Sequence, residues 1–341
     1  FFHDACVSYE VLLADGSIVT AEADNEHSNL FHAIPGSYGS LGVVTAATMR
    51  LQLAKPYVAM QYRLCESADD MMALMLQKWD SPDTDFIEGL AYAKDSYVLC
   101  EGQMVDEAEA VWGKRGRLRR FDRFYNRWYY RQVQKNRRKM KKNDGVWGDV
   151  VPMKDYIFRH DRGSFWMASY KLPSFIGRSI GFLLSSRQMY RMANAMPQVF
   201  DKSEIMLQDF MLPVANVSAF CADLHAYLDL YPLWFCPLKN RGAPGPIFGV
   251  PLDNGDYCNV GAYGIPKAKV FEFEADNVRM EAVLLAMQGR KVHYSHAYYD
   301  ESDFYDTIYN GAAYKLLRDK YKANGAFPTV YDKIITRGSN L

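Results

Sequence analysis

Residues 28–47 read SNLFHAIPGSYGSLGVVTAA and combine a helix signal, a turn and a strand. A short apolar run follows Ser28, a residue type that caps helix N-termini. A glycine-rich turn at 35–42 comes next and leads into the β-branched residues 43–45, which favour a strand. Because this turn enters a strand and not a helix, it lacks the order of a Rossmann dinucleotide-binding motif. Its glycines would let the backbone approach a flat or phosphorylated ligand closely, although a plain tight turn explains them too.

Helix and strand signals alternate on both sides of this segment. A hairpin is expected over 5–23, turning at Asp15-Gly16, and a second hairpin turns at Asp95-Ser96. A helix is expected over 68–79 with Ser67 as its cap. Further strands are expected near 57–65, 204–212, 232–238, 257–264 and 291–298, with helices near 215–228, 277–288 and 303–322. Hairpins with interleaved helices indicate an α+β fold, in which helices cover an antiparallel sheet.

Composition describes a globular chain without an evident metal site or membrane span. The 341 residues are 49% hydrophobic and 14% aromatic, which excludes disorder. Lys plus Arg and Asp plus Glu each number 40, so net charge points to no particular partner. No apolar run is long enough for a membrane span, and the cysteines lack the paired spacing of a zinc site, so reduced core thiols are expected. The chain opens on Phe1 directly before a strand pattern and is expected to be part of a longer protein.

Charge is concentrated in one segment. Residues 114–142 hold fourteen Lys or Arg and a single acid, Asp122. Cations recur every four residues, which predicts a basic amphipathic helix. The apolar stripe of this helix would contain Leu118, Phe121, Phe124, Tyr125, Trp128 and Val133. A solvated face balanced by acids elsewhere, an anionic membrane surface, the phosphates of a nucleotide and nucleic acid are the open interpretations, of which nucleic acid is not expected.

Several segments, in matching order along the chain, resemble a known family of flavoproteins. Residues 28–47 resemble the end of the FAD-binding domain of p-cresol methylhydroxylase-type flavoproteins. Segments 155–166, 231–237, 261–264 and 326–333 resemble the sterol delta-24 reductase (Diminuto/dwarf) branch of that superfamily. The resemblance implies FAD as cofactor, NADPH as electron donor and reduction of the delta-24 side-chain double bond of a sterol. It also implies association with the endoplasmic reticulum membrane.

The same resemblance implies a division of the chain. Residues 1–56 would be the C-terminal part of an FAD-binding domain, and 57–341 a substrate domain whose C-terminal segment lies near the flavin. The cofactor would contact Tyr38, Gly39, Ser40, Leu41, Gly42, Val43, Val44 and Thr45. The half of the domain that binds the pyrophosphate would precede Phe1, so this chain by itself is expected not to retain FAD.

Catalytic candidates follow from the chemistry that the resemblance implies. An isolated alkene accepts hydride only if its other carbon is protonated, so the site needs an acid. His293-Tyr294-Ser295-His296 resembles the "H-W-x-K" strand of related lactone and alditol oxidases, with His296 in place of Lys. Tyr298 would share its side of a regular strand. Arg159 and His160 are further candidates as partners of flavin or substrate, although His296 could be structural and Arg159 could form an ion pair.

Two other functions stay open at this point. The first is an FAD-dependent oxidase of a hydroxylated small molecule or lactone on the same fold. The second is a non-catalytic module that binds an anionic membrane or RNA through residues 114–142.

Overall fold

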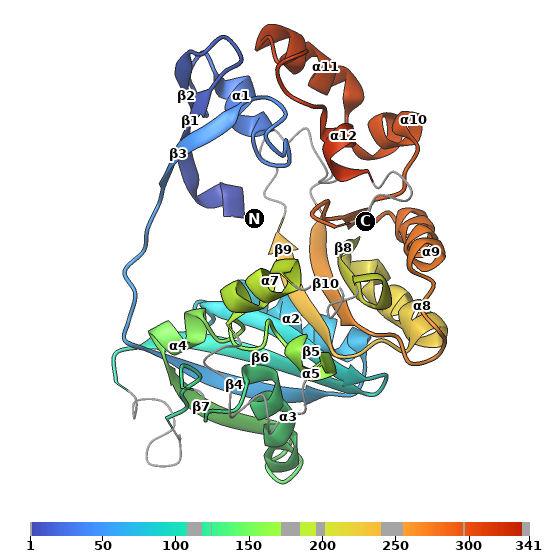
Figure 1. Cartoon of the computed structure of the whole chain (residues 1–341). Helices are drawn as coiled ribbons and strands as arrows, with labels where there is room; N and C mark the ends of the chain where they lie inside the picture. The colour runs from blue at the N-terminus through green and yellow to red at the C-terminus, as the bar shows by residue number, and fades with distance from the viewer. Residues whose placement is uncertain are drawn as a thin grey trace.

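A computed structural model describes residues 2–107, 118–123, 125–171, 185–195, 202–239, 255–295 and 297–335. Two sheets organise these residues (Figure 1). The small sheet has the strand order β2-β1-β3, and the large sheet has the order β11-β8-β10-β9-β5-β6-β4-β7. All of their strand pairs are antiparallel, so the predicted α+β class with an antiparallel sheet is confirmed.

The small sheet contains the predicted N-terminal hairpin. After a 3₁₀ turn at Phe2–Ala5, β1 (Cys6–Leu12) and β2 (Ile18–Glu22) pair across Gly16, whose φ of 84° requires glycine's freedom. The third strand, β3 (Val43–Met49), lies at the edge, and all of its residues are exposed. Helix α1 (Ser28–Ala33) begins at Ser28 itself. The Ser28 hydroxyl donates to the carbonyl of Ala23 and does not cap the helix.

The large sheet contains most of the predicted strands. Its strands are β4 (Tyr57–Cys65), β5 (Phe86–Ala93), β6 (Ser96–Val105), β7 (Val146–Pro152), β8 (Met206–Pro213), β9 (Leu233–Lys239), β10 (Asp256–Gly264) and β11 (Arg290–Lys291). The predicted strand 291–298 is wrong, because pairing stops after Lys291. Beyond that residue, Tyr294 and Ser295 bind side chains of β8 and not its backbone.

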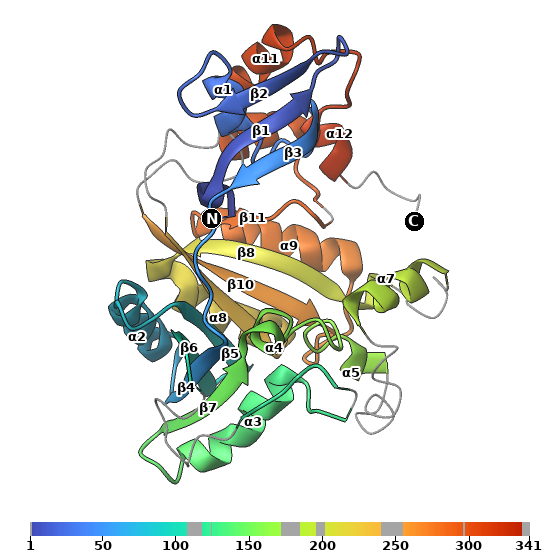
Figure 2. The same cartoon turned by 90° about the vertical axis from the view of Figure 1, so that its left-hand side faces the viewer.

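Helices cover both faces of the large sheet (Figure 2). On one face, α2 (Ala68–Trp79), α8 (Val217–Leu228) and α9 (Phe273–Ala286) form a core with the strands. The predicted cap of α2 is confirmed, since Ser67 accepts a hydrogen bond from the Asp70 amide. On the other face lie α3 (Tyr129–Met140), α4 (Met153–Ile157) and α5 (Ala168–Lys171), with α7 (Ser186–Ala195) nearby. None of the helices in the described ranges is long and apolar enough to cross a membrane.

The C-terminal elements return to the small sheet, as Figure 1 shows. They are α10 (Glu301–Asp303), a π-turn (Phe304–Ile308), α11 (Gly311–Lys320) and α12 (Val330–Ile334). Their apolar side chains share one hydrophobic cluster with β1 and α1. The predicted single helix 303–322 is therefore wrong. The chain breaks at Asn310, whose side chain accepts from the Ala313 amide and starts a new helix.

The predicted basic helix is much shorter than 114–142. Only α3 is helical among the described residues of this segment, and 108–117 and Phe124 lie outside them. Arg162 explains the irregular part, because its guanidinium donates to the carbonyls of Phe121, Arg123 and Asn126, which a helix would have used internally. In the predicted stripe, Phe121, Trp128 and Val133 are buried, whereas Leu118 and Tyr125 are exposed.

Candidate functional site

The glycine-rich loop, the segment after β11 and the large sheet meet at one junction. The Tyr38 hydroxyl accepts a hydrogen bond from the His293 amide at 3.0 Å. The neighbouring Tyr294 hydroxyl donates to Asp209 of β8 at 2.7 Å. Asp209 also accepts from Tyr263 of β10 at 2.7 Å. Residues more than two hundred positions apart thus form one polar cluster, which we call the Tyr38 junction.

Residues of the C-terminal helices donate hydrogen bonds to the glycine-rich loop. The Lys333 ammonium donates to the carbonyls of Tyr38 and Gly39 at 2.8 and 3.1 Å. Arg318 donates to the carbonyl of Ser40 at 2.7 Å. These carbonyl oxygens therefore bind the protein's own cations, and any ligand of this loop has to use its other side.

Burial divides the predicted cofactor-binding residues into two groups. Ser40, Leu41 and Gly42 are buried, and Leu41 belongs to the cluster shared with the C-terminal helices. Gly39 is half-buried with a φ of 70°. The exposed members of the set are Tyr38, Val43, Val44 and Thr45. A ligand at this loop can contact the exposed members directly, whereas the buried ones shape the loop.

Gly42 has a structural reason to be glycine. A Cβ at this position would lie 2.6 Å from Val11 Cγ1 and 2.9 Å from the Leu12 carbonyl oxygen. We therefore expect Gly42→Ala to reduce the free energy of unfolding by about 1–3 kcal/mol through overpacking against β1. Val43→Ala, on the exposed neighbour, should change it by less than about 0.5 kcal/mol. Urea unfolding of both variants measures this, and equal stabilities would contradict the close packing.

Arg159 and His160 bind a buried carboxylate on β5. The Arg159 guanidinium donates to both oxygens of Glu88, at 3.0 and 2.8 Å. His160 Nε2 lies 3.2 Å from the same carboxylate, and the Trp234 indole donates to it at 2.8 Å. Burial by itself would raise the pKa of Glu88, but Arg159 and His160 outweigh it and hold that pKa well below its usual range. Glu88 is thus a buried anion.

Aromatic rings connect Glu88 with the Tyr38 junction. His160 stacks on Phe165 with ring centroids 4.3 Å apart. Phe165 in turn lies 5.2 Å from Trp234 and 5.3 Å from Tyr263, whose hydroxyl binds Asp209. This face of the large sheet is therefore an aromatic wall with an acidic residue, Glu88 or Asp209, at each end. Sequence reasoning missed Glu88 and Asp209, although each is the only charged residue of a largely apolar strand.

The His293 ring is buried and has no hydrogen-bond partner among the described residues. Neither ring nitrogen is bonded among the described residues, and the ring lies among Tyr38, Tyr299 and Phe304. Burial, with the charges of Lys291 and Arg290, lowers the pKa of His293 to about 3. The ring is therefore neutral near pH 7, and its two nitrogens are buried without a partner in the described residues.

Of the two predicted acids, His296 and Tyr298, the structure describes only Tyr298. His296 lies outside the described residues. Tyr298 is half-buried, and burial raises its pKa to about 12, so its hydroxyl stays protonated at neutral pH. The Tyr298 amide donates to Glu281 at 3.1 Å, and Glu281 also binds the buried Lys291 at 2.7 Å. This pair anchors the segment after β11.

The described residues contain no group of His, Cys, Asp and Glu that could hold a metal ion, and the six cysteines are free.

Comparisons with known proteins show which proteins this chain resembles. No family model matches the chain. It is 28% identical to human Delta(24)-sterol reductase over 341 aligned residues, which cover 98% of this chain and 64% of the human protein. The Arabidopsis thaliana Delta(24)-sterol reductase is 28% identical, with coverage of 97% and 63%, and the Caenorhabditis elegans homologue is 26% identical, with 99% and 66%. The chain thus spans less than two thirds of the length of these relatives.

Among solved structures, a VAO-type flavoprotein from Myceliophthora thermophila superposes with a TM-score of 0.53 at 15% identity, over 96% of this chain and 56% of that one. The fold is therefore that of the VAO-type flavoproteins, as predicted. The chain is similar to the Delta(24)-sterol reductases along nearly its whole length. The predicted resemblance to that branch is confirmed.

Proposed function

We propose that the full-length protein is an FAD-dependent oxidoreductase that reduces the delta-24 side-chain double bond of a sterol, with NADPH as electron source. The observation that carries this proposal is similarity to Delta(24)-sterol reductases over 98% of the chain. The aromatic wall supports it as well, because ring faces can stabilise the cationic character that develops at a tertiary carbon when an alkene is protonated.

The residues at the Tyr38 junction fit a flat, partly polar cofactor. Tyr38 and the exposed strand β3 offer apolar contact, and Thr45 of that strand offers a hydroxyl group. FAD bound there would supply the hydride chemistry. In this proposal Tyr298 and His296 are the candidate acids. Arg159 and His160 act through Glu88 and keep Trp234 and Phe165 in place along the wall.

Flavin spectroscopy of the full-length protein tests the activity. We expect NADPH to bleach the flavin absorbance and a sterol with a delta-24 double bond to restore it under anaerobic conditions. Restoration only by oxygen, together with bleaching by a hydroxylated substrate, would favour the alternative of an FAD-dependent oxidase. A full-length protein without flavin would contradict both enzymatic functions.

We also propose that residues 1–56 belong to an FAD-binding domain and 57–341 to a substrate domain, whose C-terminal segment packs on the small sheet and lies near the flavin. Val44 and Ile18 provide a matched test, since both are exposed on the small sheet and only Val44 belongs to the predicted cofactor set. We expect Val44→Asp in the full-length protein to lower the flavin content per protein, because it places an anion against the cofactor. Ile18→Asp should leave the content unchanged. Equal flavin content in both variants, at equal stability, would contradict the placement.

Finally, we propose that the protein associates with an anionic membrane surface, such as that of the endoplasmic reticulum, through the basic segment 114–142. Of the apolar residues of α3, Tyr129, Val133 and Met140 are buried in the protein, so attraction would be electrostatic and weaken with salt. Co-sedimentation with anionic but not neutral vesicles, lost at high salt, is expected. Equal binding to both would contradict it.

A further inference from the structure

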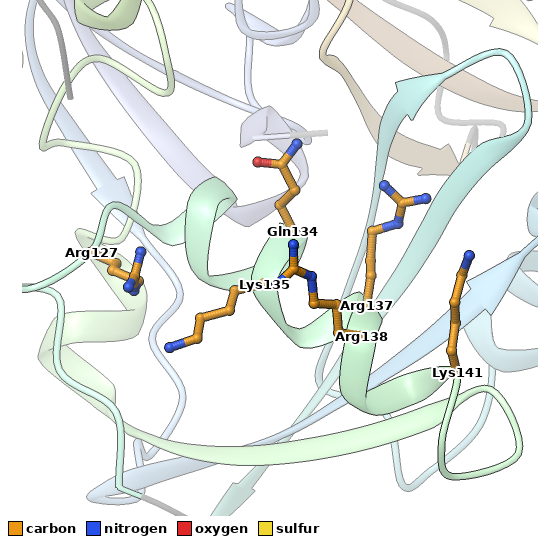
Figure 3. A pocket seen from close by; sticks show the side chains of 6 residues that line it. All are labelled: Arg127, Gln134, Lys135, Arg137, Arg138 and Lys141. Atoms are coloured by element: carbon orange, nitrogen blue, oxygen red, sulfur yellow. The ribbon is translucent and has the colours of Figure 1, made fainter.

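The outer side of α3 carries a basic hollow of about 530 Å³ (Figure 3). It is lined by Arg127, Gln134, Lys135, Arg137, Arg138 and Lys141. A second hollow of about 340 Å³ adjoins it and shares Arg127 and Lys135. The described residues that line the two hollows include no acid. We call the first the α3 basic hollow.

Most of its cations have no acidic partner among the described residues. Arg127, Lys135, Arg138 and Lys141 have no carboxylate within ion-pair distance in the part of the chain that the structure describes. By contrast, Arg119 of the second hollow lies 3.1 Å from Asp149. Arg137 lies against the Tyr92 ring at 5.7 Å, and its buried Nε atom has no hydrogen-bond partner in the described residues. The hollow therefore has a strongly positive electrostatic potential, and at least one of its N–H donors, Arg137 Nε, has no partner in the described residues.

Helix stability alone does not explain these charges. Cations near a helix C-terminus are favourable, which accounts for Arg137 and Arg138 in the last turn of α3. Arg127 lies before the N-terminus of α3, and Lys135 lies in its middle. Lys135, Arg138 and Lys141 are also spaced three residues apart, a spacing at which like charges repel on a helix. A bound anion would remove this repulsion.

The geometry selects the chemistry of that anion. Guanidinium groups bind phosphate oxygens with paired hydrogen bonds, and a concave site surrounds a compact anion better than a flat surface does. We propose that the α3 basic hollow binds a ligand with two or more closely spaced phosphate groups. Helix α3 lies at the end of the large sheet remote from β1–β3 (Figures 1 and 2), so the proposal is independent of the reductase activity.

Two double variants separate a site from diffuse charge. Lys135→Ala/Arg138→Ala removes two cations that line the hollow. Arg131→Ala/Lys142→Ala removes two exposed cations of the same segment that do not line it. The full chain is titrated calorimetrically with inorganic pyrophosphate. It is also sedimented with phosphatidylcholine vesicles that contain either phosphatidylinositol bisphosphate or phosphatidylserine at equal total charge.

We expect the hollow variant to weaken binding of pyrophosphate, of the phosphoinositide vesicles, or of both by about tenfold or more, and the control variant by less than about twofold. An effect confined to vesicles identifies a lipid headgroup as the phosphate source, and one confined to pyrophosphate identifies a soluble ligand. Equal weakening by both variants, or no binding of either probe, would overturn the site. Equal binding to both anionic vesicles, weakened alike by both variants, would overturn it and leave the membrane proposal standing.

Discussion

Replacing Glu88 with Gln should destabilise the protein by about 3–5 kcal/mol, because the substitution leaves the Arg159 guanidinium buried without its counter-ion. The side chains of Glu88 and Arg159 are only 3% and 13% exposed, so water cannot replace the lost carboxylate. The Trp234 indole and His160 would lose charge-assisted hydrogen bonds at the same time. Urea unfolding followed by tryptophan fluorescence measures the change in the free energy of unfolding.

The exposed pair between Asp80 and Lys239 is the matched control. The side chain of Asp80 is 77% exposed, so Asp80→Asn should cost no more than about 1 kcal/mol. A loss below about 1 kcal/mol for Glu88→Gln as well would show that Glu88 is not a buried anion. Because Glu88 supports the aromatic wall, we also expect this variant to bind a sterol substrate more weakly.

Acidification from pH 7 to pH 5 should cost about 2 kcal/mol of stability through His293 alone. Its folded-state pKa of about 3 lies below the ordinary value of 6.5, so the unfolded chain binds the proton first. The contribution of the neutral ring to the free energy of unfolding is therefore fully present above pH 6.5 and is lost as the pH falls toward 3. His293→Phe should remove this dependence, because its neighbours are aromatic rings and its nitrogens bond nothing in the described residues.

The measured quantity is the difference in unfolding free energy between the unmodified chain and the variant at the two pH values. This difference cancels contributions from the other titrating groups. A difference between pH values of less than about 0.5 kcal/mol for His293→Phe would contradict the buried neutral ring.

Several elements could be predicted from the sequence because their signals are local. Helix α2 was predicted at its observed bounds, since Ser67 caps the same turn in which the apolar period begins. Strand β4 was likewise predicted at its observed bounds. The hairpin at Gly16 depends on a residue that tolerates a positive φ. The family resemblance added the flavoprotein fold, which the structural comparison confirms.

The errors arose where contacts from distant segments replace local hydrogen bonds. Basic and apolar residues alternate with a helical period through 118–128, yet Arg162 takes the backbone carbonyls there and prevents the helix. Strand β7 was not expected at all, although it pairs with β4 along its whole length. Edge strands of this kind are stabilised by their partner, and their own sequence carries a weak signal.

The sequence by itself determined the α+β class, most helices and strands, the relationship to sterol reductases and the concentration of positive charge before residue 142. Only the tertiary structure decided what the polar residues do. Glu88 lies 71 residues from Arg159 and 146 from Trp234, and Tyr38 lies 255 residues from His293. Periodicity reports which face of an element is apolar, whereas the pairing of a buried charge depends on which distant groups share its low-dielectric surroundings.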